Sequence, residues 1–298
     1  MNHLPFTLTA YLFNAFSVLA SKFLLNKTIP DPLVYIFYIS LISILAIFAL
    51  PFTHIPSVAI FNLASLSTLL WTLGAYLMFK ALKIGHVSRV VPVIGTLIPL
   101  ILLITASGTN AIATIQAWAI LILILGMVFL SLQNLLQRSL SKREIIYEVL
   151  SAGSFALSYI ILRQAYLGAD FFSVLVWSRL ILLPLCFLML IIPSLRRKII
   201  TSKGTQINFF SKTGFIFLGG QVSGALSEFL LLFSISLANP ALVNSLQGSQ
   251  YAFLFILAII LGKKYPQIFE EKYTLLTLIP KIIGIILITL GLYLLSTS

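Results

Sequence analysis

Ten apolar runs of about twenty residues each constrain this chain more than any other feature of its sequence. A helix rises ~1.5 Å per residue, so about 20 residues cross the ~30 Å hydrocarbon core of a bilayer. The composition agrees, because 60% of the residues are hydrophobic and 9% are charged. The sequence therefore predicts an all-α integral membrane protein with ten transmembrane helices. We place these at 5–25, 32–50, 62–82, 86–106, 114–132, 145–165, 171–192, 214–237, 240–261 and 276–296.

Composition and motifs exclude several other classes of protein. A membrane β-barrel needs short segments of alternating polarity, whereas these runs are continuously apolar. The net charge of +12 does not indicate nucleic-acid binding, because no segment remains for a soluble domain with a basic patch. Cys186 is the single cysteine, and His3, His54 and His86 are widely scattered, so we expect no metal site. We also expect no cofactor and no enzymatic activity, since no P-loop and no credible catalytic cluster is visible.

The lysine and arginine residues occupy every second gap between the apolar runs. Seventeen of the 19 follow the first, third, fifth, seventh or ninth span, and the exceptions are Arg163 and Arg179. Basic loops stay on the cytoplasmic side of a membrane. The charge pattern therefore predicts a multi-pass protein of the plasma membrane whose odd-numbered loops face the cytosol and whose termini both lie outside.

The two halves of the chain share short patterns in the same order. Residues 79–87 resemble 233–241, and the run LGMVFLS at 125–131 resembles LGLYLLS at 290–296. Because five spans per copy is an odd number, the second copy must have the opposite orientation to the first. The sequence predicts an inverted repeat of residues 1–135 and 143–298. Such repeats are typical of secondary transporters, whose binding site lies near the midplane between the halves.

Three motifs then form a recognisable set. They are Phe79–Ser88 leading into Val91-Pro92-Val93 and Ile98-Pro99-Leu100, Trp177-Ser178-Arg179-Leu180, and Leu261-Gly262-Lys263-Lys264 followed by Gly284 and Leu290-Gly291. Together they resemble the helix junctions of EamA-type transporters, which belong to the drug/metabolite transporter superfamily. The resemblance covers essentially the whole chain.

This resemblance implies a secondary transporter for a small polar metabolite, an amino acid or a related compound, coupled to protons or to exchange. It also implies that both termini are cytosolic, which disagrees with the charge pattern. Two positions depart from the family pattern: Ser40 replaces a frequent arginine, and Ser107-Gly108-Thr109 replaces the usual Gly-Glu-Arg.

Two opposite charges lie at the same depth of the predicted bundle. Arg179 is the ninth residue of the span 171–192, and Glu228 lies about ten residues from the end of 214–237. Consecutive spans run antiparallel, so both side chains are about 13–15 Å from the same face. Charged groups inside a bilayer are costly, so we expect the two to pair. The pair is either a structural salt bridge or a site that contacts substrate or carries a proton.

Further polar and aromatic residues are candidates for the same site. Asn244, Gln247 and Tyr251 share a face of the span 240–261, with Gln250 nearby, and they either line a cavity or join helices through hydrogen bonds. Asn14 lies at a similar depth. Trp177, Tyr159 and Trp71 either form aromatic walls of the site or serve helix packing and interfacial placement. The candidate substrate-binding or coupling residues are Glu228, Arg179, Asn244, Gln247, Gln250, Asn14, Trp177 and Tyr159.

Two other functions stay open at this point. A lipid-modifying membrane enzyme would need a catalytic cluster near an interface, whereas the expected charges lie deeper. A non-transporting membrane scaffold would tolerate Glu228→Gln without functional effect. A channel is disfavoured because no acidic ring or filter-like loop is visible.

The expected partners are a small-molecule substrate and the lipid bilayer. The identity of the substrate, the direction of transport, the coupling ion and the oligomeric state are left open.

Overall fold

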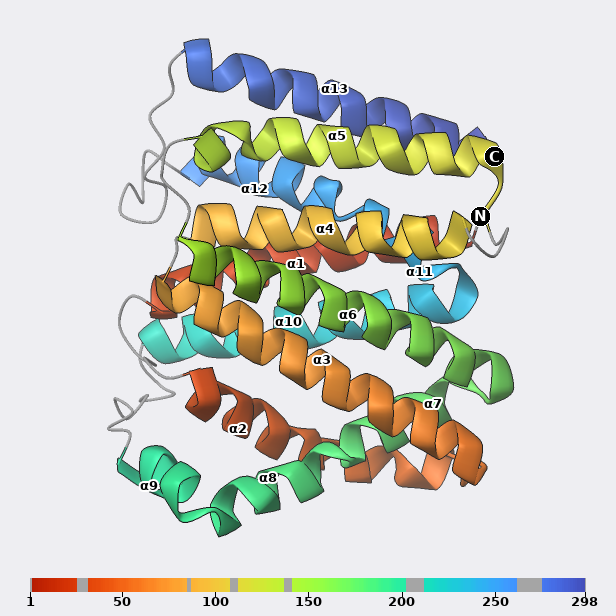
Figure 1. Ribbon diagram of the computed structural model, residues 1–298, viewed down its shortest axis with the longest axis vertical. Coiled ribbons are helices and arrows are strands. Elements are labelled where there is room, and N and C mark those ends of the chain that lie inside the picture. The colour runs from red at the N-terminus through yellow and green to blue at the C-terminus, as the bar shows by residue number, and fades with distance from the viewer. Residues whose placement is uncertain are drawn as a thin grey trace.

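The computed structural model describes residues 2–25, 32–84, 87–107, 112–136, 141–201, 212–261 and 275–297, and every regular element in these ranges is a helix (Figure 1). In chain order the elements are α1 (Leu4–Leu25), α2 (Pro32–Ile42), the 3₁₀ helix η1 (Ser43–Phe52), α3 (Val58–Ile84), α4 (Val87–Ser107), α5 (Thr114–Leu136), α6 (Lys142–Gly168), α7 (Phe171–Leu180), α8 (Leu182–Ile191), α9 (Pro193–Thr201), α10 (Lys212–Leu237), α11 (Pro240–Ser245), α12 (Gly248–Leu261) and α13 (Leu275–Thr297).

Five helical segments among the described residues are long and apolar enough to cross a membrane. They are Val58–Ile84, Lys142–Gly168, Phe171–Ile191, Gly214–Leu237 and Leu278–Leu295. Four more apolar helical segments are shorter, at Leu4–Ala20, Ser40–Phe52, Val90–Ala106 and Thr114–Leu130. The outer surface agrees with a lipid environment, because Trp118, Phe187 and Ile191 expose 61%, 67% and 73% of their surface.

Three of the expected spans are interrupted helices. The span expected at 32–50 is α2 followed by η1, and that expected at 171–192 is α7 followed by α8. Pro184 explains the second break, because proline has no N–H for the carbonyl of residue 180 and its ring clashes there. In the span expected at 240–261, α11 ends at Ser245 and α12 begins at Gly248. By contrast, α4 stays continuous despite Pro92 and Pro99.

Helix ends inside the bundle are closed by side chains. The Asn239 side chain accepts a hydrogen bond from the N–H of Ala241 at 2.9 Å, which starts α11. At the C-terminus of α10, Arg163 donates from Nη1 to the carbonyl oxygen of Ile235 at 3.0 Å and also to that of Ser236. A cation there also complements the helix dipole. Arg163, one of the two basic residues outside the odd-numbered gaps, therefore serves as a helix cap.

Three helix pairs have the most extensive packing: α1 with α10, α3 with α6, and α5 with α13. Figure 1 shows α5 beside α13 at one edge of the bundle and α3 beside α6 nearer its centre. Small residues allow the close approach. A Cβ atom at Gly284 of α13 would lie 2.8 Å from the carbonyl oxygen of Gly126 in α5, and one at Gly220 of α10 would lie 2.5 Å from Cβ of Ala20 in α1.

We expect Gly284→Ala to destabilise the protein by about 1–3 kcal/mol, because the added methyl group would force the α5 and α13 backbones apart. Gly153→Ala is the matched control, since a Cβ atom at Gly153 would meet nothing within 4 Å. Thermal unfolding of both variants in detergent measures the difference. Equal melting temperatures for the two variants would contradict the packing described here.

Candidate functional site

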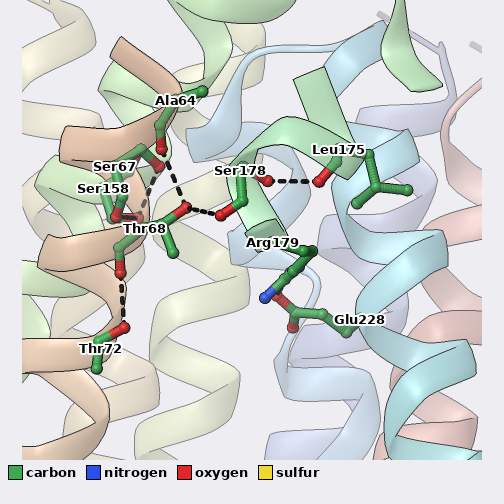
Figure 2. A network of polar contacts seen from close by, with 9 residues as sticks. All are labelled: Ala64, Ser67, Thr68, Thr72, Ser158, Leu175, Ser178, Arg179 and Glu228. Carbon is green, nitrogen blue, oxygen red and sulfur yellow. Dashed lines mark hydrogen bonds and ion pairs between the residues drawn. The ribbon is translucent and has the colours of Figure 1, made fainter. Parts of the chain in front are cut away.

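Arg179 and Glu228 form an ion pair between α7 and α10. Nη2 of Arg179 donates to Oε1 of Glu228 at 2.9 Å, which confirms the expected pairing (Figure 2). The two side chains are 22% and 28% exposed, so neither is sealed within the protein core. An unpaired charge at this depth would cost ~2.5–3.5 kcal/mol on insertion scales. Pairing offsets that cost while leaving both groups partly accessible.

The C-terminal end of α7 is fixed by hydroxyl groups. Thr68 of α3 lies with Oγ1 3.1 Å from the carbonyl oxygen of Ser178 and 3.0 Å from that of Ala64, and its proton is shared between them. Ser178 in turn donates to the carbonyl oxygen of Leu175 at 2.7 Å. Figure 2 shows these contacts directly beside Arg179. Because α7 ends at Leu180, its last carbonyl oxygens lack helical partners, and α3 supplies one.

A second set of hydroxyl contacts joins α3 to α6. Ser67 donates to the carbonyl oxygen of Ser158 at 3.0 Å, and Ser158 donates to that of Ser67 at 2.8 Å. About two turns earlier in α6, Ser151 donates to the carbonyl oxygen of Gly74 at 2.8 Å. These bonds hold α3 and α6 in a fixed register. That register sets the positions of the aromatic residues on their shared face.

Trp71 and Tyr159 surround the ion pair from α3 and α6. The guanidinium carbon of Arg179 lies 5.7 Å from the centroid of the Trp71 ring, which is cation–π geometry. Tyr159 is buried, shares a hydrogen bond with the Trp71 side chain, and interacts electrostatically with both Arg179 and Glu228. Phe155 stacks on Tyr159 at 6.5 Å between ring centroids. Trp71 and Tyr159 therefore lie beside the charged pair.

Trp177 points away from the charged pair. Its indole N–H donates to the carbonyl oxygen of His54 at 3.1 Å, and its ring meets Phe61 edge-on at 6.1 Å. Trp177 is two residues before Arg179, and two residues turn an α-helix by about 200°. The two side chains therefore leave opposite sides of α7, and Trp177 packs α7 against the segment between η1 and α3.

Helix α1 connects the ion pair to the interrupted span α11–α12. Asn14 donates from Nδ2 to Oε1 of Gln250 at 3.1 Å, and the Tyr11 hydroxyl donates to the carbonyl oxygen of Val243 at 3.3 Å. Tyr11 and Asn14 are three residues apart and share one face of α1. Tyr11 also interacts electrostatically with Glu228. Asn14 and Gln250 therefore lie together, one helix away from the charged pair.

Asn244 and Gln247 lie elsewhere on the interrupted span. The Asn244 amide is buried and donates to the carbonyl oxygen of Pro240 at 2.9 Å, so its side chain serves α11 itself. Gln247 packs on α4, where a Cβ atom at Gly95 would lie 2.8 Å from Nε2 of Gln247. The Asn244 side chain therefore serves α11 and that of Gln247 lies against α4, and neither forms a hydrogen bond with Arg179 or Glu228.

One tyrosine and two glutamates inside the bundle were not predicted from the sequence. Tyr166 is buried, interacts electrostatically with Arg179 and Glu228, and has no hydrogen-bond partner for its hydroxyl among the described residues. It lies seven residues after Tyr159 on the same face of α6, a spacing that the sequence already contains. Glu144 and Glu148 are 3% and 1% exposed in the first turns of α6. The span expected at 145–165 leaves Glu144 outside it, and Glu148 lies in its first turn.

Asp170 begins α7 as its N-cap, accepting a hydrogen bond from the N–H of Ser173 at 2.9 Å. Burial acts to raise the pKa of the Asp170 carboxyl, but hydrogen bonds from the Ser173 hydroxyl and backbone outweigh it, so the pKa lies below its usual value. The ionised group therefore adds stability above the ordinary aspartate pKa of ~3.9. That contribution is lost as the pH falls through the lowered folded-state pKa.

Comparisons with known proteins bear on the fold alone. No protein-family model matches the sequence, and a search of curated proteins found no match. One solved structure, named only "Crystal structure of protein", superposes with a TM-score of 0.66 at 14% sequence identity, covering 99% of this chain and 96% of that chain. The arrangement of helices is therefore shared with that protein over nearly the full length of both.

We expect the energies of Arg179 and Glu228 to be coupled. Arg179→Ala should destabilise more than Glu228→Gln, because it leaves a carboxylate without its cation inside the bundle. The double variant should lose less than the sum of the two single losses, with a coupling free energy of about 0.5–3 kcal/mol. Unfolding of the three variants in detergent measures this. Additive losses would mean that the two side chains do not interact in the folded protein.

Proposed function

We propose that the protein is a secondary active transporter that moves a small polar metabolite, such as an amino acid or a related compound, across the plasma membrane. The observation that carries this proposal is the partly exposed Arg179–Glu228 pair at the point where α7 is interrupted. Charges within transmembrane segments typically mark substrate or ion pathways. Interrupted helices near the midplane are a recurrent feature of transporter binding sites.

Helix pairing supports ten spans arranged as an inverted repeat of residues 1–135 and 143–298. In that scheme α1 and α6 are equivalent, as are α3 and α10, and α5 and α13. If each helix is replaced by its equivalent in the other repeat, the α1–α10 pair becomes the α6–α3 pair, and the α5–α13 pair becomes itself. These are the three most extensive helix pairs in the structure. The equivalent second and seventh spans are both interrupted. The two termini lie at the same end of the bundle in Figure 1, as an even number of spans requires.

The charged pair suits a substrate that carries both signs of charge. A substrate carboxylate would bind the Arg179 guanidinium, and a substrate ammonium group would bind the Glu228 carboxylate, so that the protein's own ion pair opens as substrate enters. Each charge then keeps a partner throughout, which avoids the cost of a bare charge in the membrane. Trp71 and Tyr159 would contact the uncharged part of the substrate.

The same pair offers a route to coupling. A proton on Glu228 would remove the attraction to Arg179 and to a substrate ammonium group. Proton binding and substrate binding would then compete for one carboxylate, which is the simplest form of exchange coupling. Tyr11, Tyr159 and Tyr166 all interact electrostatically with Glu228.

An aromatic cluster closes the site on the side of the termini. The Phe171 ring lies 5.2–5.5 Å from the rings of Tyr166, Phe172, Phe229 and Phe233. Arg179 lies eight residues after Phe171, which is about 12 Å deeper along α7. Glu228 lies five residues before Phe233, which is about 8 Å deeper along α10. The cluster therefore stands between the ion pair and that end of the bundle. We assign it the role of a closed gate on that side.

The orientation in the membrane follows from the charge pattern. The ends of α3 and α9 and the starts of α6 and α10, which carry basic residues, lie opposite the termini in Figure 1. The positive-inside rule places this basic end in the cytosol and the termini outside. The EamA-type resemblance, which also supports the transporter class, implies the reverse orientation. The gate at Phe171 would then face the cytosol.

We expect Glu228→Gln to abolish or uncouple transport in proteoliposomes supplied with a mixture of labelled amino acids, with and without a pH gradient. The neutral amide cannot bind an ammonium group or exchange a proton in the same way. Asp170→Asn is the control, because it removes a carboxylate outside the site and keeps the α7 cap. Wild-type transport in Glu228→Gln would favour a scaffold, and activity on lipid without any transport would favour a lipid-modifying enzyme.

A further inference from the structure

Helix α9 is a short amphipathic helix that follows α8 directly. Leu195 and Ile199, four residues apart, face inward and pack with Cys186 and Met189 of α8 and Phe37 of α2. Figure 1 places α9 at the end of the bundle opposite the termini, beside α8 and near the start of α2. One face of α9 is therefore anchored to the α2–α8 unit.

The opposite face of α9 carries three consecutive basic residues. Arg196, Arg197 and Lys198 are all exposed. Because successive residues are turned by about 100°, Arg197 points away from Leu195 and Ile199, while Arg196 and Lys198 leave the two flanks of α9. Arg196 and Lys198 form no ion pair with any residue that the structure describes. The three side chains therefore form a basic patch that wraps around the outward half of α9.

Apolar side chains exposed to the surroundings lie on both sides of this patch along the chain. Ile191 before α9 is 73% exposed, and Ile200 within it is 66% exposed. On α8, Phe187 and Leu188 are 67% and 52% exposed, as expected for side chains in contact with lipid tails. The basic patch thus lies where an apolar lipid-facing surface ends. This combination is typical of helices that lie in the headgroup layer of a membrane.

We propose that the basic face of α9 binds the headgroup phosphates of anionic phospholipids, with Arg196 and Lys198 each holding a phosphate on its own flank of the helix. The Arg196 guanidinium presents parallel N–H donors to the phosphate oxygens of one lipid, and the Lys198 ammonium binds the phosphate of a second. The acyl chains of these lipids lie along Ile200, Ile191 and the exposed side chains of α8. Only a membrane setting is required, so this inference is independent of the proposed transport activity.

The site has a structural consequence for the rest of the seventh span. Helix α9 continues from α8, and α8 continues from α7, which carries Arg179. A lipid bound to α9 ties this span to the plane of the headgroups at the end opposite the aromatic cluster. Anionic lipid should therefore stabilise the whole folded protein rather than α9 alone.

The test uses the full-length protein in neutral detergent, titrated with short-chain phosphatidylglycerol, phosphatidylcholine or inorganic phosphate. For the wild type we expect phosphatidylglycerol to raise the melting temperature and the other two to have little effect. Arg196→Gln with Lys198→Gln should weaken the apparent affinity for phosphatidylglycerol about fivefold per charge removed, which corresponds to ~1 kcal/mol each. High salt should weaken wild-type binding in the same direction.

Lys142→Gln with Arg143→Gln is the matched control, because it removes two exposed basic residues at the start of α6, at the same end of the bundle. The proposal requires this control to keep wild-type affinity. Equal loss in both double variants, equal stabilisation by phosphatidylcholine, or stabilisation by inorganic phosphate alone would overturn it. If the α9 double variant melts early without lipid, the Lys198→Gln single variant must show about half of the loss in binding free energy.

Discussion

The hydrocarbon core of a bilayer offers no water to hydrogen-bond exposed polar groups, and the rest of this structure follows from that constraint. Each break in a helix frees backbone groups that the protein must satisfy itself. Thr68 supplies a donor to the Ser178 carbonyl oxygen where α7 ends, and Arg163 supplies donors where α10 ends. Arg179 and Glu228 satisfy each other. These polar contacts between helices help to fix how the helices meet.

This arrangement leaves one place where charge, aromatic surface and an interrupted helix coincide. The close packing of α3 with α6 holds Trp71 and Tyr159 on one side of Arg179, while α10 presents Glu228 from the other. Because α7 stops at Leu180, Arg179 lies at a helix end where its charge complements the local dipole. A site built from side chains of four helices changes when any of those helices moves. That property suits a protein whose binding site must open to each side of the membrane in turn.

Much of the fold could be predicted from the sequence, because hydrophobic run length and charge placement are strong signals in a membrane protein. The pairing of Arg179 with Glu228 followed from their equal depth on neighbouring antiparallel spans. Helix rotation was harder to predict: Trp177 is close to Arg179 in sequence, yet it faces the opposite side of α7. The break at Ser245 was also missed, since no proline marks it and the turn is closed by backbone hydrogen bonds from the N–H groups of Leu246 and Gln247 to the carbonyl oxygens of Val243 and Asn244. Tyr166 was missed because the span expected at 145–165 ends one residue before it, whereas α6 continues to Gly168.

The most direct test of the account is to exchange the two charges, with glutamate at position 179 and arginine at position 228 in one variant. A purely structural ion pair stabilises the protein equally well when the two charges are exchanged. A binding site instead needs each charge beside the oppositely charged group of the substrate, and the cation–π contact with Trp71 needs the positive charge at position 179. We predict that the exchange restores most of the thermal stability lost in Arg179→Glu alone, while transport in proteoliposomes stays on the order of tenfold or more below wild type. Recovery of both stability and transport would contradict the account and leave the pair as a structural element only.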